Sequence, residues 1–376
     1  MRFSEFDDFW LPTTLSSICS FRKKRKSSIK KFYVSTENIL QNYKGIEQYN
    51  SNEVISGDEF LIGDILMANI RPYLKKVYMA EFDGVSNSDV LIFKSDIVDP
   101  HFLHCILAND NFINYVMNSV KGSKMPRGDK IHIMNYHLSI PRTKEQEKIA
   151  KFIDLLDQRI DTQSKIIEDL ELLEKEINNT IINKLVKHKD LVKFSSLYNF
   201  AKEGGTPNTS HPEYYTKGSI PFVKIDDLTT KYLVSNQSFI TKLGLENSSA
   251  WLIPANSILY SNGATIGAIS INKYPVTTKQ GILGIVPKSD YLSEYLYYFL
   301  RSNYFKKEIC KITTQGTMKS AYIKDIDNIL VPHVNKKQQN EILTLLSEIT
   351  LKTQKEKDIL ELYKKQKAYL LKNMFI

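Results

Sequence analysis

The stretch that decides the fold is residues 144–187, which read KEQEKIAKFIDLLDQRIDTQSKIIEDLELLEKEINNTIINKLVK. It has no proline or glycine, and its apolar residues fall mostly three or four positions apart. That period is typical of an amphipathic α-helix, here about 65 Å long. The stretch from Lys336 to about Lys372 has the same pattern. Because helices this long need a partner for their apolar stripe, we expect the two to pair. The expected interface residues are Ile149, Leu156, Ile160, Leu170, Ile177, Ile342, Leu346, Ile349, Ile359 and Leu370.

The two helical stretches end two copies of one pattern, roughly 190 residues apart. Residues 63–69 (GDILMAN) match residues 256–262 (NSILYSN), and residues 144–149 (KEQEKI) match residues 337–342 (KQQNEI). A repeat of this length is too long for a solenoid and indicates two domains of one fold. If the halves are pseudo-symmetric, the two helices run antiparallel and the globular domains lie at opposite ends of a rod.

Each globular half mixes short runs of β character with short helical patterns, so the predicted fold class is α+β. The expected strands include residues 90–93, 131–134, 257–260, 266–271 and 281–286, and the expected helices include residues 100–119 and 290–307. The predicted organisation is a first globular domain (1–143), a central helix (144–188), a second globular domain (189–335) and a C-terminal helix (336–376).

The charge balance favours a polyanionic partner without proving one. Lys and Arg number 51 against 42 Asp and Glu, which gives a net charge of +9. The three cysteines, Cys19, Cys105 and Cys310, lie far apart and suggest neither a zinc site nor a disulfide framework. The N-terminus lacks the features of a signal peptide, and no stretch approaches the length of a membrane span. We therefore expect a cytoplasmic protein.

Several short motifs resemble one family over essentially the whole chain. They are residues 204–207 (GGTP), 212–215 (PEYY), 218–222 (GSIPF), 225–228 (IDDL) and 278–281 (TKQG), with an Ile-Pro or Val-Pro pair before each long helix. Each motif is weak alone, but their order, spacing and duplication together are specific. The chain resembles the specificity subunits of Type I restriction–modification systems, called HsdS.

The resemblance implies that each globular half is a target-recognition domain for one half of a bipartite DNA site. The paired helices, an antiparallel coiled coil, would hold the half-sites about one DNA turn apart. It also implies two modification subunits that use S-adenosylmethionine and two restriction subunits that use ATP and Mg²⁺. No catalytic residue, metal or cofactor is expected in this chain. The first half departs from the pattern, because it lacks the GGTP string and has residues 21–26 (FRKKRK) instead.

The candidate DNA contacts are polar residues in loops of both halves. Lys and Arg can neutralise phosphates, and Arg, Asn and Gln can pair with base edges. Lys121, Lys124 and Arg127 around Gly122 match Gln315, Thr317 and Lys319 around Gly316. The remaining candidates are Arg22, Lys23, Lys24, Arg25, Asn69, Arg71, Lys75, Thr206, Asn208, Asn262, Thr265, Lys279 and Gln280. For the asparagines the alternative interpretation is an ordinary turn.

Two other function classes stay open at this stage. A stand-alone DNA methyltransferase or nuclease needs cofactor and catalytic motifs, and the sequence has no Pro-Pro pair, GxGxxG or phosphate-binding loop. Asp226 and Asp227 with Lys231 form a weak nuclease-like group, which we interpret as structural. A coiled-coil scaffold that binds proteins shares every helical feature. Only the recurrence of Lys, Asn, Gln and Thr in equivalent loops argues against that scaffold.

Overall fold

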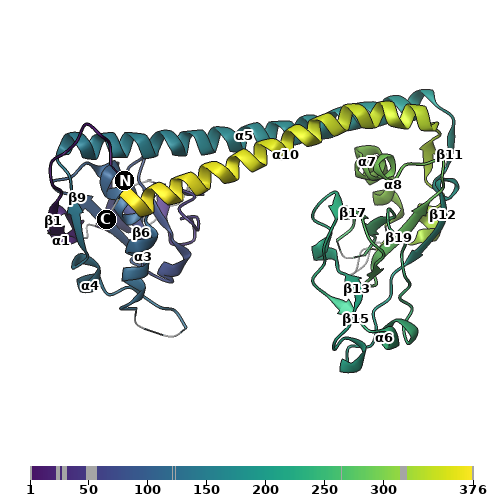
Figure 1. The fold of residues 1–376 in the computed structure, drawn as a ribbon, viewed down its shortest axis with the longest axis horizontal. Helices are drawn as coiled ribbons and strands as arrows, with labels where there is room; N and C mark the ends of the chain where they lie inside the picture. The colour runs from purple at the N-terminus through teal and green to yellow at the C-terminus, as the bar shows by residue number, and fades with distance from the viewer. Residues whose placement is uncertain are drawn as a thin grey trace. The chain divides into compact units, whose positions relative to one another are not determined.

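The computed structural model describes residues 2–22, 26–27, 32–47, 57–120, 122, 124–263, 265–313 and 320–374. The chain forms two compact units. Unit 1 comprises Met1–Lys165 and Lys357–Ile376, and unit 2 comprises Ile166–Glu356. Each unit is therefore a globular domain together with one segment of each long helix (Figure 1).

Unit 1 contains two four-stranded sheets and a two-stranded ribbon. The larger core lies on the antiparallel sheet β2-β9-β6-β7, whose central strands are buried and apolar. Its strands are β2 (Cys19–Phe21), β9 (Val90–Ser95), β6 (Ile65–Ala68) and β7 (Val77–Met79). The second sheet has the order β3 (Lys26–Ser27), β5 (Gly57–Phe60), β8 (Gly84–Ser86) and β4 (Phe32–Val34), with β4 parallel to β8. The ribbon pairs β1 (Leu11–Thr14) with β10 (His137–Ile140).

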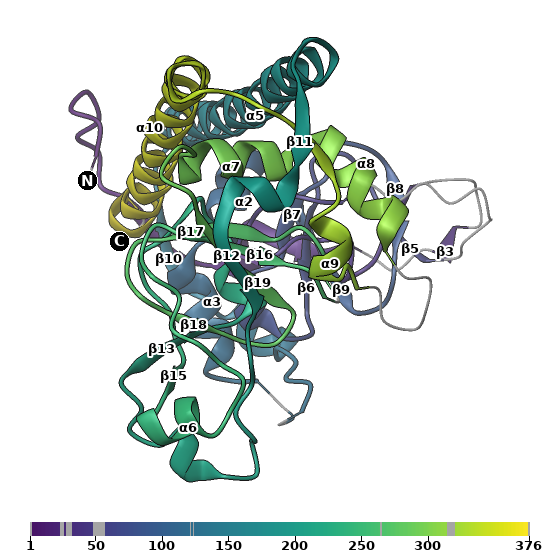
Figure 2. The same ribbon diagram turned by 90° about the vertical axis from the view of Figure 1, so that its right-hand side faces the viewer.

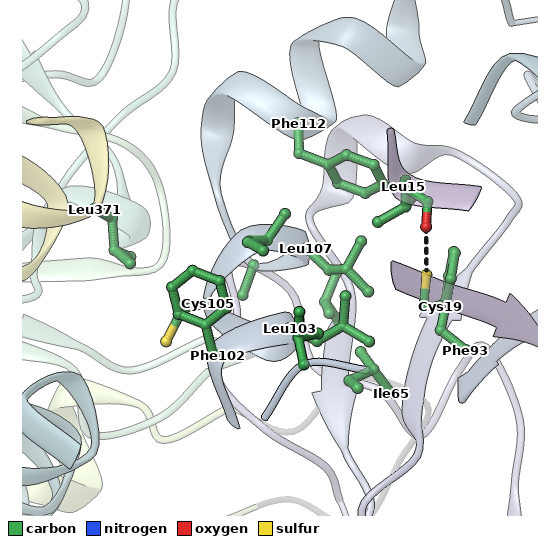
Figure 3. Packing of buried hydrophobic residues seen from close by; sticks show 14 of the residues in the cluster. Leu15, Cys19, Ile65, Phe93, Phe102, Leu103, Cys105, Leu107, Phe112 and Leu371 are labelled. Atoms are coloured by element: carbon green, nitrogen blue, oxygen red, sulfur yellow. Dashed lines mark hydrogen bonds between the residues drawn. The ribbon is translucent and has the colours of Figure 1, made fainter. Parts of the chain in front are cut away.

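Short helices cover the first sheet of unit 1. They are α1 (Leu15–Ile18), η1 (Pro72–Leu74), α2 (Pro100–Leu107), α3 (Asp110–Met117) and α4 (Lys130–Met134). Asp99 begins α2 because its Oδ1 accepts a hydrogen bond from Phe102 N at 2.9 Å, and Pro100 suits the first helical position. Figure 3 shows the result: Phe102 and Leu103 of α2 lie in one core with Ile65 and Phe93 of the sheet.

Unit 2 repeats this plan, with one strand more in the main sheet and one fewer in the second sheet. Its main sheet has the order β12 (Tyr198–Glu203), β19 (Ile282–Pro287), β16 (Ile258–Ser261), β17 (Ile269–Asn272) and β14 (Tyr232–Leu233). A second sheet contains β15 (Phe239–Ile240), β13 (Ile220–Val223) and β18 (Thr277–Thr278), and a ribbon pairs β11 (Leu191–Lys193) with β20 (Leu330–Pro332). Its helices are η2 (Phe194–Leu197), η3 (Pro212–Tyr214), η4 (Ile225–Asp227), α6 (Lys242–Glu246), α7 (Ser293–Arg301), α8 (Asn303–Ile312) and α9 (Ile323–Ile326). Helices α7 and α8 pack on the main sheet (Figure 2).

The order of the strands confirms the internal duplication. Sheet β2-β9-β6-β7 corresponds to β12-β19-β16-β17, ribbon β1-β10 to β11-β20, and the parallel pair β4-β8 to β13-β18. Helices α2, α3 and α4 correspond in the same way to α7, α8 and α9. The predicted α+β class, with two repeated domains that each lead into a long helix, is therefore correct.

The two long helices, α5 (Thr143–His188) and α10 (Lys336–Met374), run antiparallel where they meet within unit 1. Lys367 Nζ donates to Asp157 Oδ1 at 2.5 Å, and the guanidinium of Arg159 lies 5.3 Å from the ring centre of Tyr363. Residue numbers thus rise along one helix as they fall along the other. Within unit 2, Thr350 Oγ1 donates to Glu174 Oε1 at 2.8 Å.

The buried or half-buried positions of the long helices recur every three and four residues, as in a coiled coil. All ten predicted interface residues are buried or half-buried. Several of them also belong to the domain cores: Ile149, Leu156 and Leu370 in unit 1, and Ile177, Ile342 and Leu346 in unit 2. The stripe is interrupted by buried polar residues, namely Gln163, Thr353 and Glu356. Among the described residues no helix has both the length and the hydropathy that a membrane span requires.

A glutamine at the start of each long helix makes the same contacts in both units. Gln146 Oε1 accepts from Asp99 N at 3.1 Å, and its Nε2 donates to Pro141 O at 2.8 Å. Gln339 Oε1 accepts from Leu292 N at 2.8 Å, and its Nε2 donates to Val334 O at 2.9 Å. Both side chains are buried. The repeated glutamine therefore fixes each long helix to the start of α2 or α7.

Three local expectations differ from the structure. The stretches 100–119 and 290–307, each expected as one helical pattern, are two helices each, α2 with α3 and α7 with α8. Residues 131–134 were predicted as a strand, but residues 130–134 form helix α4. Asp129 is the reason, because its Oδ1 accepts hydrogen bonds from Ile131 N at 2.9 Å and His132 N at 3.2 Å and so caps the helix. A four-residue apolar run cannot by itself distinguish a strand from a helix.

Candidate nucleic-acid interface

In unit 1, three separate segments meet where strand β6 ends. We call this the first junction: residues 69–71 after β6, Asp89 before β9, and residues 126–128 before α4. Asn69 N donates to Asp89 O at 2.8 Å, Gly128 N donates to Asn69 O at 3.3 Å, and Arg71 N donates to Pro126 O at 2.8 Å. A β-bridge between Ile70 and Arg127 completes it. Backbone hydrogen bonds thus hold these loop residues together.

Unit 2 contains the equivalent second junction, formed by Asn262, Gly263, Gly281 and Ala321. Asn262 N donates to Gly281 O at 3.0 Å, and Ala321 N donates to Asn262 O at 3.0 Å. These are the counterparts of the bonds that Asn69 makes. Gly281 has a φ of +89°, a conformation that favours glycine.

Asn69 and Asn262 were predicted as base contacts, and the structure places both inside their junctions. Their exposed fractions are only 9% and 4%. Asn262 Nδ2 donates to Ala321 O at 3.1 Å. The Oδ1 atoms of both asparagines have no hydrogen-bond partner among the described residues. This burial favours a role in holding the loops over direct contact with bases.

Beside the second junction, the GGTP string lies against the TKQG string. Gly204 N donates to Ile282 O at 2.9 Å, and Gln280 N donates to Thr206 Oγ1 at 3.3 Å. A Cβ on Gly204 would lie 2.2 Å from Thr278 Oγ1, so only glycine fits there. The packing leaves Lys279 and Gln280 exposed. Three predicted contacts, Thr206, Lys279 and Gln280, are therefore brought together.

Two further predicted residues of unit 2 lie in exposed loops. Asn208 Oδ1 accepts from Ser210 N at 3.0 Å, which is a side-chain turn of the kind that asparagine commonly forms. Thr265 is exposed in the loop between β16 and β17. The turn gives Asn208 a structural role whether or not it contacts DNA.

Two predicted cations of unit 1 are held by carboxylates. The guanidinium of Arg22 pairs with both carboxylate oxygens of the buried Asp64, with Nη2 to Oδ1 at 2.7 Å. This hydrogen bonding raises the pKa of Arg22. Lys75 Nζ lies 2.8 Å from a carboxylate oxygen of Asp110. Both side chains thus have structural partners.

The other described cations of unit 1 are more accessible. Arg71 and Lys124 are exposed. Arg127, with 54% of its side chain exposed, pairs with Asp89 at 2.9 Å between Nη2 and Oδ1. Seven of the predicted contacts, Lys23, Lys24, Arg25, Lys121, Gln315, Thr317 and Lys319, lie outside the described residues.

The structure also adds a residue that the sequence did not indicate. Asp89 was not predicted, because an acidic residue is not expected to contact a polyanion. The duplication contained a signal for this residue. Asp89 comes immediately before β9 and Gly281 immediately before β19, and these two strands correspond to each other.

Two members of the nuclease-like group, Asp227 and Lys231, have structural contacts. Asp227 Oδ2 accepts a hydrogen bond from Lys224 N at 2.8 Å. Lys231 Nζ lies 4.5 Å from the ring centre of Tyr298 and 5.2 Å from that of Tyr232. Burial lowers the pKa of Lys231. Within the described residues no group of three or more His, Cys, Asp or Glu side chains is arranged to hold a metal ion.

The Type I restriction modification DNA specificity domain matches the chain twice, over residues 12–172 and 182–363. The chain belongs to this family. The first matched segment begins in ribbon strand β1, and the second begins in the last turns of α5, before ribbon strand β11. Each extends into a long helix, so the two segments follow the structural duplication.

Individual relatives agree with this membership. The chain is 31% identical over 209 residues to the Type I restriction enzyme MjaIX specificity subunit of Methanocaldococcus jannaschii, an alignment that covers 54% of this chain and 47% of the relative. It is 24% identical over 250 residues to the EcoR124I/EcoR124II specificity subunit of Escherichia coli, covering 62% of each chain. The chain thus spans about half to two thirds of these relatives.

Solved structures agree on the fold. The S subunit of the Type-I restriction-modification system from M. genitalium gives a TM-score of 0.53 at 15% identity, covering 98% of this chain and 96% of that one. A chain solved in work on complex assembly of the type I R-M system gives 0.64 at 17% identity, covering 96% of each chain.

Proposed function

We propose that the chain is a non-catalytic specificity subunit whose two units each bind one half of a bipartite site in duplex DNA. The observation that carries the proposal is the pair of equivalent junctions. Each junction fixes the loops of a repeated domain by equivalent backbone hydrogen bonds. Cationic or amide side chains are exposed beside each junction: Arg71, Lys124 and Arg127 in unit 1, and Lys279 and Gln280 in unit 2. Cations bind phosphates, and Arg and Gln recognise guanine and adenine edges.

The long helices would serve as the spacer and as the docking surface for partner subunits. Several of their leucines are exposed, including Leu155 and Leu172 on α5 and Leu351 and Leu362 on α10. Exposed apolar positions beside a coiled-coil seam suit protein contacts. The partners in this proposal are two modification subunits, which would bind S-adenosylmethionine, and two restriction subunits, which would use ATP and Mg²⁺.

The experiment is DNA retention by the complex of this chain with its modification subunits, at physiological salt and with competitor DNA. We expect retention of particular sequences that is lost when this chain is omitted. Protein binding without sequence-specific retention would support a scaffold instead. Binding of S-adenosylmethionine by this chain alone would contradict the non-catalytic role.

A further inference from the structure

We propose that Arg127 reads a guanine in the half-site bound by unit 1, and that Asp89 is the positioning residue for its guanidinium. The inference rests on the proposed function, and it names the base and the side chain that recognises it. Arginine suits guanine because its planar fork can donate two hydrogen bonds to O6 and N7 in the major groove. Lysine lacks that fork.

The backbone on both sides of this pair is fixed. Arg127 forms a β-bridge with Ile70. The residues on either side of Arg127 are also bonded: Pro126 O accepts from Arg71 N, and Gly128 N donates to Asn69 O. Asp89 O accepts from Asn69 N. The backbone positions of Arg127 and Asp89 are therefore both held by the same short segment, residues 69–71. A reader must be placed to within about half an ångström, which such a support allows.

The ion pair with Asp89 orients the Arg127 guanidinium and leaves other N–H donors of this group available. One oxygen of Asp89 accepts from Nη2 of Arg127 at 2.9 Å. A guanidinium has five N–H donors, so the others stay available to a base. The exposed fractions are 54% for the Arg127 side chain and 33% for that of Asp89. Arg22 contrasts with this, because both carboxylate oxygens of buried Asp64 accept from it and its side chain is only 22% exposed.

Unit 2 lacks this pair at the equivalent place. Gly281 O accepts from Asn262 N as Asp89 O does from Asn69 N, so Gly281 corresponds to Asp89. Gly128 N donates to Asn69 O, and Ala321 N donates to Asn262 O, so Ala321 corresponds to Gly128. The residues immediately before these two, Ser320 and Arg127, therefore correspond as well. The guanine reader therefore belongs to unit 1, and the half-site of unit 2 is an internal control.

The test is selection of bound sequences from random duplex DNA by the assembled complex, with wild-type chain and with Arg127→Ala, Arg127→Lys, Asp89→Asn and Arg142→Lys. We expect the wild type to select one guanine in the half-site of unit 1 that Arg127→Ala loses, a roughly 5- to 150-fold fall in preference. Arg127→Lys keeps the charge but not the fork, so it should not restore that preference. Asp89→Asn should weaken preference at the same position. Arg142→Lys changes an exposed arginine that pairs with Asp8 outside the first junction, so it should leave that preference intact.

Two results separate the possible failures. If Arg127→Ala weakens binding to all sequences equally and Arg127→Lys restores it, Arg127 contacts a phosphate and the inference is wrong. If the wild type selects no pair of half-sites, the proposed function itself fails. Unchanged thermal melting of each variant complex, and an unchanged half-site of unit 2, would exclude loss of folding as the cause.

Discussion

At the scale of single residues, Asn69 and Asn262 illustrate how one side-chain type can hold the same loop in two domains. Each lies at the end of a buried strand, and the main chain of each bonds to two other segments. A buried amide that loses its partners is costly, so these positions should matter for stability first.

Replacement of Asn262 by alanine is expected to lower the free energy of unfolding by about 1–3 kcal/mol, because the bond to Ala321 O is lost in a buried site. Base preference should stay the same. Denaturant unfolding measures the first effect and sequence selection the second. Asn340→Ala, at an exposed position of helix α10, is the control. A changed base preference at unchanged stability would show that Asn262 reads a base after all.

Lys124 is exposed beside the first junction and is expected to bind a phosphate. Lys124→Ala should weaken binding about equally at all sequences and should reduce the slope of log affinity against log salt by about one. The measurement is affinity of the complex for one duplex over a series of salt concentrations. Lys165→Ala, on helix α5, should leave the slope unchanged. An unchanged slope for Lys124→Ala would remove Lys124 from the phosphate contacts.

His104 of α2 is expected to make the protein sensitive to acid. Burial, and to a lesser degree the charge of Lys367, lowers its pKa from 6.5 to about 4. Below about pH 6.5 this histidine is protonated in the unfolded chain, whereas in the folded chain it stays neutral down to about pH 4. The free energy of unfolding therefore falls as the pH falls through this window. The expected loss from this group between pH 7 and pH 5 is roughly 2 kcal/mol.

The check is denaturant unfolding of wild type, His104→Gln and His101→Gln at pH 7 and pH 5. Only His104→Gln should lose less stability than wild type on acidification. Equal acid sensitivity in all three proteins would mean that His104 does not remain neutral in the folded state.

At the scale of elements, the long helices combine an apolar stripe with a few buried polar positions. A repeat of seven residues keeps the same face toward the partner helix. Polar side chains in such a seam, here Gln163, Thr353 and Glu356, can specify register at some cost in stability.

Removal of one heptad from each long helix is therefore expected to preserve the pairing and to shorten the helices by about 10 Å, close to three base pairs of DNA. The spacer between half-sites should shorten while both half-sites stay the same, which sequence selection with the variant complex measures. Removal of two residues from each helix would rotate the seam by about 200° and is the destabilised control. Altered half-sites with an unaltered spacer would contradict the spacer role.

Features set by a long periodic pattern could be predicted from the sequence, whereas features set by one cap or by a contact between distant residues could not. The long helices were predictable because their period extends over many turns. Helix α4 was not, because one cap at Asp129 decided it. The pairing of Arg22 with Asp64 and of Arg127 with Asp89 could not be predicted, since each partner lies about 40 residues away in sequence. The proximity of Thr206 to Gln280 likewise required the folded sheet.

At the scale of the whole molecule, the duplication is the dominant feature. One strand order and one set of junction bonds occur twice, while the exposed residues beside them differ between the halves. A fold that repeats while its loop chemistry changes is suited to recognising two different short sequences with one chain. The two half-sites are therefore expected to be unlike in sequence.

The most direct measurement is a map of methylated bases in the host genome, with the gene for this chain present and deleted. The expected result is one motif of two short, unlike blocks separated by a constant unread spacer, absent from the deletion strain. A single continuous motif, or methylation that persists without this chain, would contradict recognition of a bipartite site by its two units.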